Sequence, residues 1–86
     1  MFYVYILKSL KDGTLYMGST NDLRRRFTEH NSGQGKYTKK HAPYVLVYYE
    51  AYKAEQDALD RESNLKLRRN AFSQLKRRIR ESIKAN

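Results

Sequence analysis

Two stretches near the start of the chain carry the apolar pattern of β-strands. Residues 2–8 are aromatic and β-branched, and residues 14–19 repeat that character. Between them lies a polar segment with an Asp12-Gly13 turn signal. The pattern predicts a β-hairpin.

The register of this hairpin decides which tyrosines share a face of the sheet. Successive side chains of a strand point to opposite faces, so the parity of the paired residue numbers fixes the arrangement. An odd-sum register places Tyr5 on the same face as Tyr16 and Gly18, and a slip by one residue separates the two tyrosines. The candidate site described below depends on the odd-sum register.

A helical pattern follows the hairpin. The Thr20-Asn21-Asp22 segment supplies capping side chains and negative charge for the first turn, and Gly33 and Gly35 end the helix after about Asn31. The stripe expected to face the sheet consists of Leu23, Arg26, Phe27 and His30. Two ionisable side chains therefore lie in an inward position, whereas Arg24 and Arg25 point elsewhere.

The middle of the chain predicts a loop and a third strand. Residues 32–43 are basic and rich in turn-forming residues, so we expect a flexible connector that either is solvated or lies against a polyanion. Residues 44–52 are almost continuously apolar and aromatic. Because such runs are typical of strands covered on both faces, we expect this strand to be the central or best-protected one.

The period becomes helical again from Ala54. Ala58, Leu59 and Leu65 form an apolar stripe, and Glu62 lies inside it. A buried carboxylate is costly unless it is paired, so a metal ion or Arg26 is the expected partner.

A second helix is expected to end the chain. Asn70 is expected to interrupt the first one, and a basic amphipathic helix follows over residues 72–84. The element order is strand, strand, helix, strand, helix, helix. It predicts one α+β domain over residues 1–86, with a small three-stranded antiparallel sheet flanked by helices.

The composition of the chain predicts a negatively charged binding partner. The 86 residues include 18 Lys and Arg against 9 Asp and Glu, for a net charge of +9. Nucleic acid is the commonest polyanion bound by small basic proteins, while an anionic membrane surface and structural RNA are the open alternatives. The absence of cysteine excludes disulfides and thiolate zinc sites, and no signal-peptide pattern or run of about 20 apolar residues is present. We expect a cytoplasmic monomer without a small-molecule cofactor.

The assembled residues resemble the GIY-YIG nuclease superfamily, most closely its small stand-alone bacterial members. Val4-Tyr5-Ile6 and Tyr16-Met17-Gly18 correspond to the two segments that name the family, and Arg26 and His30 follow at the family's spacing. Glu62 lies in a segment, residues 58–66, that resembles the family's glutamate helix. The resemblance covers nearly the whole chain.

Three departures from the family pattern limit what the resemblance transfers. Tyr3-Val4-Tyr5 stands where the first Gly-Ile-Tyr is usual, and Met17 replaces the central isoleucine of the second segment. Ser19 stands where the excision-repair members carry lysine, so no lysine role is transferred. A family asparagine after the glutamate helix has no secure counterpart, and Asn70 is the nearest candidate.

The resemblance implies cleavage of DNA phosphodiester bonds with one divalent metal ion, Mg²⁺ or Mn²⁺, held by Glu62. Arg26 would stabilise charge on the phosphate, and Tyr5 or Tyr16 would help to activate water. A phenol with a pKa of about 10 needs nearby cations to act as a base, or else orients the water. His30 would relay a proton or hydrogen-bond a phosphate oxygen.

A set of basic residues is expected to hold the DNA, with single-stranded or branched DNA of repair or recombination as candidate substrates. The set consists of Arg24, Arg25, Lys36, Lys39, Lys40, Lys66, Arg68 and Arg69. Three alternatives stay open. The tyrosines pack without chemistry, Arg26 and Glu62 form a structural ion pair, or the chain is a non-catalytic nucleic-acid-binding module. Attachment to a membrane surface through residues 72–84 is a further alternative.

Overall fold

The computed structural model describes residues 1–34 and 36–85, with the side chains of residues 36 and 37 excepted. Three strands and five helices make up this part of the chain. In order they are β1 (Phe2–Ser9), β2 (Leu15–Thr20), α1 (Leu23–Asn31), α2 (Lys36–His41), β3 (Tyr44–Tyr52), α3 (Glu55–Leu67), α4 (Arg69–Arg78) and α5 (Arg80–Lys84). The predicted α+β class and the three-stranded antiparallel sheet are confirmed.

The strand order is β2-β1-β3, so β1 is the central strand. Its residues Val4 to Leu7 are at most 2% exposed, because both faces of β1 are covered. The expectation that the third strand is central was wrong. β3 pairs with β1 along one edge only, and Leu46 and Tyr49 on it are 37% and 52% exposed.

The hairpin has the odd-sum register. Tyr5 pairs with Gly18 and Leu7 pairs with Tyr16, so these side chains share one face of the sheet. Gly13 adopts a φ of +77° in the connecting turn, a conformation that glycine reaches without strain. The turn thus sets the register, and the two tyrosines lie on one face.

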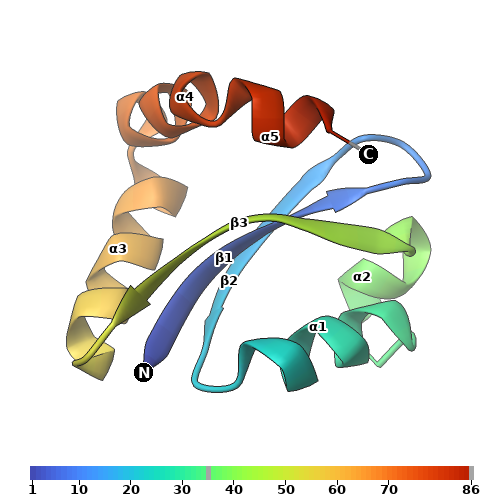
Figure 1. The fold of residues 1–86 in the computed structure, drawn as a ribbon, viewed down its shortest axis with the longest axis horizontal. Helices are drawn as coiled ribbons and strands as arrows, with labels where there is room; N and C mark the ends of the chain where they lie inside the picture. Colours follow the sequence, from blue (N-terminus) through green and yellow to red (C-terminus); the bar gives the residue numbers. More distant parts are fainter. Residues whose placement is uncertain (35, 86) are drawn as a thin grey trace.

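Helices cover the two faces of the sheet differently (Figure 1). On one side, α3, α4 and α5 pack on the face of β1 that carries Val4 and Ile6, and burial of Leu65 and Leu75 makes this core apolar. On the other side, α1 packs on the face that carries Tyr5 and shares a core with aromatic residues. α1 and α3 therefore lie on opposite faces.

A bulge in β3 changes which of its residues meet each face. The β1–β3 pairing shifts between Ile6 and Leu7, leaving Val47 without a paired residue. Leu46 pairs with Leu7 and Tyr49 pairs with Tyr5, so both side chains lie on the Tyr5 face. Without the bulge, two residues three positions apart on a strand would point to opposite faces.

Two local expectations were wrong. The predicted loop over residues 32–43 contains α2, which is anchored because Thr38 is buried and Ser9 Oγ donates to the His41 carbonyl at 2.5 Å. The last helix is two helices that break at Ile79, and α3 ends at an extended Arg68 rather than at Asn70. Within residues 1–34 and 36–85, none of the helices has the length and apolar character needed to cross a bilayer.

Candidate functional site

The Tyr5 side chain crosses the backbone of β2 at Gly18. A Cβ atom on Gly18 would lie 2.5 Å from the Tyr5 hydroxyl oxygen and 2.8 Å from Cζ, closer than any real contact of this kind. Tyr5 is 2% exposed, so its ring has little room to move. Glycine at position 18 therefore lets the Tyr5 hydroxyl reach the β2 edge of the sheet.

His30 of α1 is hydrogen-bonded to Tyr5. The Tyr5 hydroxyl lies 2.8 Å from His30 Nε2, and His30 is 1% exposed. Burial lowers the pKa of His30, and the nearby positive charge of Arg26 lowers it further. The imidazole is therefore neutral at neutral pH, and in the tautomer protonated at Nδ1 its Nε2 accepts from the Tyr5 hydroxyl. Such burial favours the proton-relay interpretation over direct contact with a phosphate.

The Tyr5 phenol is held in its protonated form. Burial raises the pKa of Tyr5 to about 12, and the neighbouring Tyr16 adds to this, while a hydrogen bond from Arg26 opposes it. Tyr16 lies beside the pair, with its ring edge-on to His30 at a centroid distance of 4.9 Å. Of the two predicted roles for a tyrosine, orienting a water fits Tyr5 better than acting as a free base.

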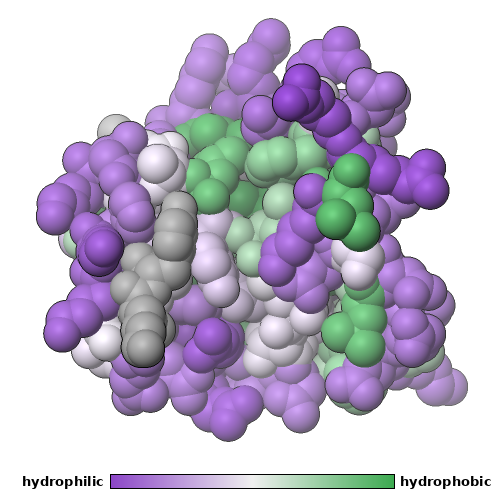
Figure 2. Space-filling model, turned by 180° about the vertical axis from the view of Figure 1, so that it is seen from behind, coloured by the Kyte–Doolittle hydropathy of each residue, from purple (hydrophilic) through white to green (hydrophobic). Residues whose placement is uncertain are grey.

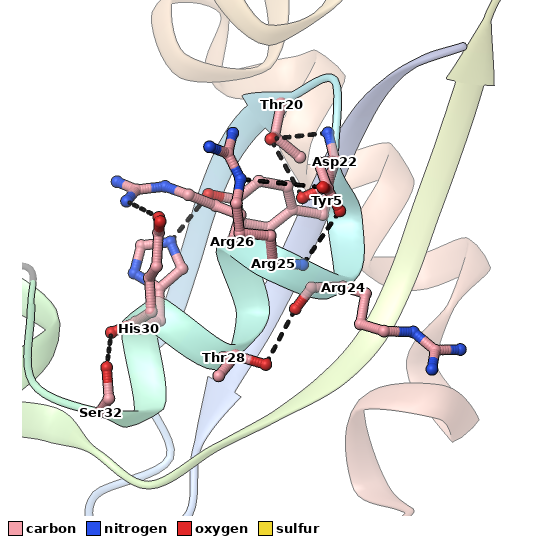
Figure 3. Close-up of polar contacts among 10 residues, drawn as sticks. Tyr5, Thr20, Asp22, Arg24, Arg25, Arg26, Thr28, His30 and Ser32 are labelled. Carbon is pink, nitrogen blue, oxygen red and sulfur yellow. Dashed lines mark hydrogen bonds and ion pairs between the residues drawn. The ribbon is translucent and has the colours of Figure 1, made fainter.

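Arg26 lies over Tyr5 at the outer side of this pair (Figure 3). Its Nη1 bonds Glu29 Oε1 at 3.0 Å, and this bond is the main cause of a raised Arg26 pKa. The alternative in which Arg26 and Glu62 form a structural ion pair was wrong, because Arg26 pairs with Glu29 and Glu62 with Lys66. The two side chains start on opposite faces of the sheet, and Glu29 is one helical turn from Arg26.

Glu62 approaches the same edge from the other face. Its Oε1 accepts a 2.8 Å hydrogen bond from Ser19 Oγ, and its Oε2 lies 2.8 Å from Lys66 Nζ. Ser19 follows Gly18 directly and points to the α3 face, because adjacent residues of a strand alternate. The carboxylate is still close enough for its charge to contribute to the raised pKa of Tyr5. The candidate site therefore gathers around the β2 edge.

Sequence reasoning overlooked three contacts of this site. The pairs Arg26–Glu29 and Glu62–Lys66 have i, i+3 and i, i+4 spacing, which is a signal for neighbouring charges on a helix. The spacing gives Lys66, predicted only as a DNA contact, a second role. The bond from Ser19 has no such signal, because it joins residues 43 positions apart.

The donor set around Glu62 suits a loosely held hard cation. Among the described residues, no group of three or more His, Cys, Asp or Glu side chains could hold a metal ion. A single carboxylate, 18% exposed and next to a hydroxyl, can bind Mg²⁺ when waters and phosphate oxygens complete the coordination. The site fits an ion that arrives with its substrate rather than a resident structural metal.

The predicted DNA-contacting residues are distributed over several helices. Arg24, Arg25, Lys39, Lys40, Arg68 and Arg69 are exposed. Arg25 is also paired with Asp22 at 3.8 Å, and the side chain of Lys36 lies outside the described part of the structure. Figure 2 shows that hydrophilic residues dominate the rim of one face. Hydrophobic side chains also appear on that face. On α3, Leu59 and Leu67 are the exposed large ones, at 41% and 83%.

Comparison with known proteins gives a consistent match. The family model described as the GIY-YIG catalytic domain matches residues 1–78. A UPF0213 protein of Clostridium perfringens is 48% identical over 77 residues, which cover 87% of this chain and 82% of that protein. One from Staphylococcus saprophyticus is 48% identical over 65 residues, covering 74% and 78%. The solution NMR structure of a UPF0213 protein from Bacillus halodurans, 41% identical, covers 87% of this chain and 82% of its own, with a TM-score of 0.53.

Proposed function

The chain belongs to the GIY-YIG catalytic domain family, and from this we propose that it is an endonuclease that hydrolyses DNA phosphodiester bonds with a divalent metal ion. The observation that carries the proposal is the meeting of two clusters at the edge of β2. The Tyr5–His30 hydrogen bond lies on one side of Gly18, and the Glu62 carboxylate held by Ser19 lies on the other.

Glu62 is the proposed metal ligand. Bound Mg²⁺ or Mn²⁺ would neutralise charge on the scissile phosphate and on the leaving oxygen. Lys66 is 51% exposed, so it can release Glu62 Oε2 at little cost. Ser19 keeps its hydrogen bond to Oε1 and holds the carboxylate towards the β2 edge.

Tyr5 and His30 are the proposed route for a proton. Tyr5 hydrogen-bonds the attacking water and takes its proton while its own proton passes to His30 Nε2. The water oxygen bonds to phosphorus, and the bond from phosphorus to the leaving oxygen breaks. Concerted transfer fits a phenol whose pKa is raised to about 12, because no free phenolate is needed.

Arg26 is the proposed phosphate contact. Its side chain is 36% exposed, so it reaches both Tyr5 and a strand bound at the surface. Its pKa is raised by the bond to Glu29, which keeps the guanidinium charged at all working pH values. Fixed positive charge beside the phosphate stabilises the transition state.

Nicking of DNA tests the proposal. Purified protein incubated with labelled single-stranded, duplex, flap and branched DNA should cut at least one form with Mg²⁺ or Mn²⁺, and not in EDTA. Glu62→Ala should abolish cutting and retain binding, while Asp60→Ala, an exposed carboxylate on the same helix, should cut normally. Cutting by the Glu62→Ala variant at the wild-type rate would overturn the assignment. The panel also identifies the DNA form and the link to repair or recombination.

A non-catalytic nucleic-acid-binding module is the second candidate. The observation that favours it is the engagement of both Glu62 oxygens, one by Ser19 and one by Lys66. In that case no DNA form is cut with either metal. Affinity for DNA then falls by about 0.9 log units per log unit of salt for each phosphate neutralised.

A further inference from the structure

A second concave surface lies on the same face of the sheet as Tyr5, beyond α1. It is a groove of about 520 Å³ between the first turn of α1 and β3. Its apolar floor consists of Tyr3, Phe27, Leu46 and Tyr49, and Arg24 stands at its rim. None of the steps proposed above uses this groove.

The groove exposes large apolar side chains that the fold does not cover. Tyr49 is 52% exposed and Leu46 is 37% exposed, because α1 covers the sheet over β1 and leaves the β3 edge open. The bulge at Val47 brings both side chains to this face. Apolar surface rimmed by charge on a small basic protein marks a binding site more often than a packing defect.

The aromatic geometry suits a flat ligand. Tyr3 and Tyr49 lie edge to face, with ring centroids 5.9 Å apart and an interplanar angle of 66°. Tyr49 is half-exposed, and exposed aromatic rings are the surfaces on which unpaired nucleobases stack in proteins that bind single strands.

The charges around the groove suit a phosphate next to that base. Arg24 makes no ion pair within residues 1–34 and 36–85, and Figure 3 shows it extending from α1 away from the Tyr5–His30 pair. Asp22, the carboxylate at the groove, caps α1 by accepting from the Arg25 amide and is paired with the Arg25 side chain. Its negative charge is therefore already balanced.

The groove is also close to the candidate active site. Tyr49 is paired with Tyr5 in the β1–β3 ladder, and the edges β2 and β3 are two strand spacings apart, about 10 Å. Arg24 and Arg26 are on the same turn of α1. A strand with its scissile phosphate at Arg26 can thus place a neighbouring nucleotide over β3.

We propose that this groove binds an unpaired nucleobase of the nucleic-acid strand, stacked on Tyr49, with the adjoining phosphate on Arg24. The inference rests on the proposed function for its choice of ligand. It adds a site that selects substrates with an unpaired base near the cut.

Binding measured in EDTA, where no cutting occurs, tests the site. The probes are a fluorescein-labelled 20-mer of deoxythymidine and the same backbone with abasic sites. Wild-type protein should bind the thymidine strand about 5- to 160-fold more tightly, since that is the range for one stacked base. Tyr49→Ala should lose this preference and Tyr49→Phe should keep it. Both should keep the wild-type salt dependence, which phosphates determine.

A spectroscopic signal separates stacking from a structural effect. A 2-aminopurine in the strand should be quenched by wild-type protein and by Tyr49→Phe, but not by Tyr49→Leu. Leu67→Ala, an 83% exposed apolar residue on α3, serves as the control and should behave as wild type. Unchanged thermal midpoints for the Tyr49 variants would exclude unfolding as the cause.

Several results would overturn the proposal. It fails if Tyr49→Ala binds both strands as wild type does, or if wild-type protein does not distinguish them. It also fails if the substitution abolishes only dimer formation in sedimentation or only flotation with phosphatidylserine vesicles, because the occupant is then a second copy or a membrane. If the protein cuts DNA and Tyr49→Ala binds both strands as wild type does, only the groove proposal is refuted. If binding depends on Tyr49 but no DNA is cut, only the nuclease proposal is refuted.

Discussion

Glu50 and Glu62 are two carboxylates of similar burial that have opposite surroundings. Their side chains are 15% and 18% exposed. Both involve α3, because Arg61 of that helix pairs with Glu50 and Glu62 is itself a residue of the helix. Glu50 on β3 accepts hydrogen bonds from the Tyr48 and Tyr52 hydroxyls and from two nitrogens of Arg61. Glu62 is held by one serine hydroxyl and one half-exposed lysine.

The difference shows how the same residue type becomes structural at one edge and available at the other. Burial would raise the pKa of Glu50, but the hydrogen bonds from Arg61 and the two tyrosines hold it below its usual value. The donors are two tyrosine hydroxyls on β3 and the planar guanidinium of Arg61, and together they occupy both oxygens of Glu50. No oxygen of Glu50 is left for a ligand. Within the part of the chain that the structure describes, Glu62 has only one serine hydroxyl and one half-exposed lysine as partners, and Lys66 is the one that the proposed cation would replace.

Removal of a single tyrosine hydroxyl, from Tyr5 in the candidate site or from Tyr52 beside Glu50, should give the largest difference in nicking rate. Tyr5→Phe keeps the ring over Gly18 but removes the proposed proton path, so the nicking rate should fall about 10²- to 10⁴-fold. Tyr52→Phe removes a hydroxyl that serves Glu50, so it should lower the free energy of unfolding by about 1 kcal/mol and leave the rate per folded molecule unchanged. Single-turnover nicking and urea unfolding measure the two effects. Equal rate losses in both variants would erase the distinction.

Gly18→Ala should affect the Tyr5 side of the candidate site through sterics alone. The new Cβ would lie 2.5 Å from the Tyr5 hydroxyl, and the buried ring must shift. We expect a loss of about 1–3 kcal/mol in the free energy of unfolding, together with a lower nicking rate. Gly13→Ala, in the turn, is the control for a glycine change. It should destabilise through its positive φ and leave the rate per folded molecule intact.

Glu50→Gln should lower the free energy of unfolding by about 2 kcal/mol at neutral pH, because Arg61 loses its charged partner. The loss should depend on pH. A carboxyl with a lowered pKa in the folded state adds stability above its unfolded value, near 4.5, and loses it as pH falls through the folded value. The difference between wild type and variant should therefore be constant from pH 5 to 7 and shrink below about 4.5. A difference that persists at low pH would contradict the account.

Lys66→Gln should have the smallest effect and should sharpen the claim that Glu62 is exchangeable. The ion pair with Glu62 joins residues four apart on a helix with a half-exposed lysine, so stability should change by about 0.3–0.5 kcal/mol. The Mn²⁺ concentration needed for half-maximal nicking should decrease, since the metal no longer competes with an ammonium group. Lys76→Gln on α4 removes one charge elsewhere and should leave that concentration unchanged.

Local sequence patterns predicted much of the fold. The Asp12-Gly13 turn signal and the apolar strands on either side predicted the hairpin. Strict alternation showed which register puts Tyr5 and Tyr16 on one face, and the structure has that register. The i, i+3, i+4 stripe correctly put His30 on the inner face of α1. Such patterns depend on local geometry, which neighbouring residues determine.

Contacts between distant elements could not be predicted in the same way. Helical periodicity shows which side of a helix faces inward, but not which face of the sheet the helix covers. Arg26 therefore stayed open as a partner of Glu62, although the two side chains come from opposite faces. The bulge at Val47 has no sequence signal here, and without it the exposure of Tyr49 on the Tyr5 face could not be foreseen. The central position of β1 in the sheet likewise depends on the edge of the hairpin with which β3 pairs.

Titration of Mn²⁺ against ¹⁵N-labelled protein, followed by NMR, tests the central claim that Glu62 and not Glu50 is the carboxylate open to a cation. Paramagnetic broadening should centre on the amides of Ser19 and Glu62 in the wild type, disappear in Glu62→Gln, and persist in Glu50→Gln. Broadening centred on Glu50, or broadening that survives unchanged in Glu62→Gln, would contradict the account.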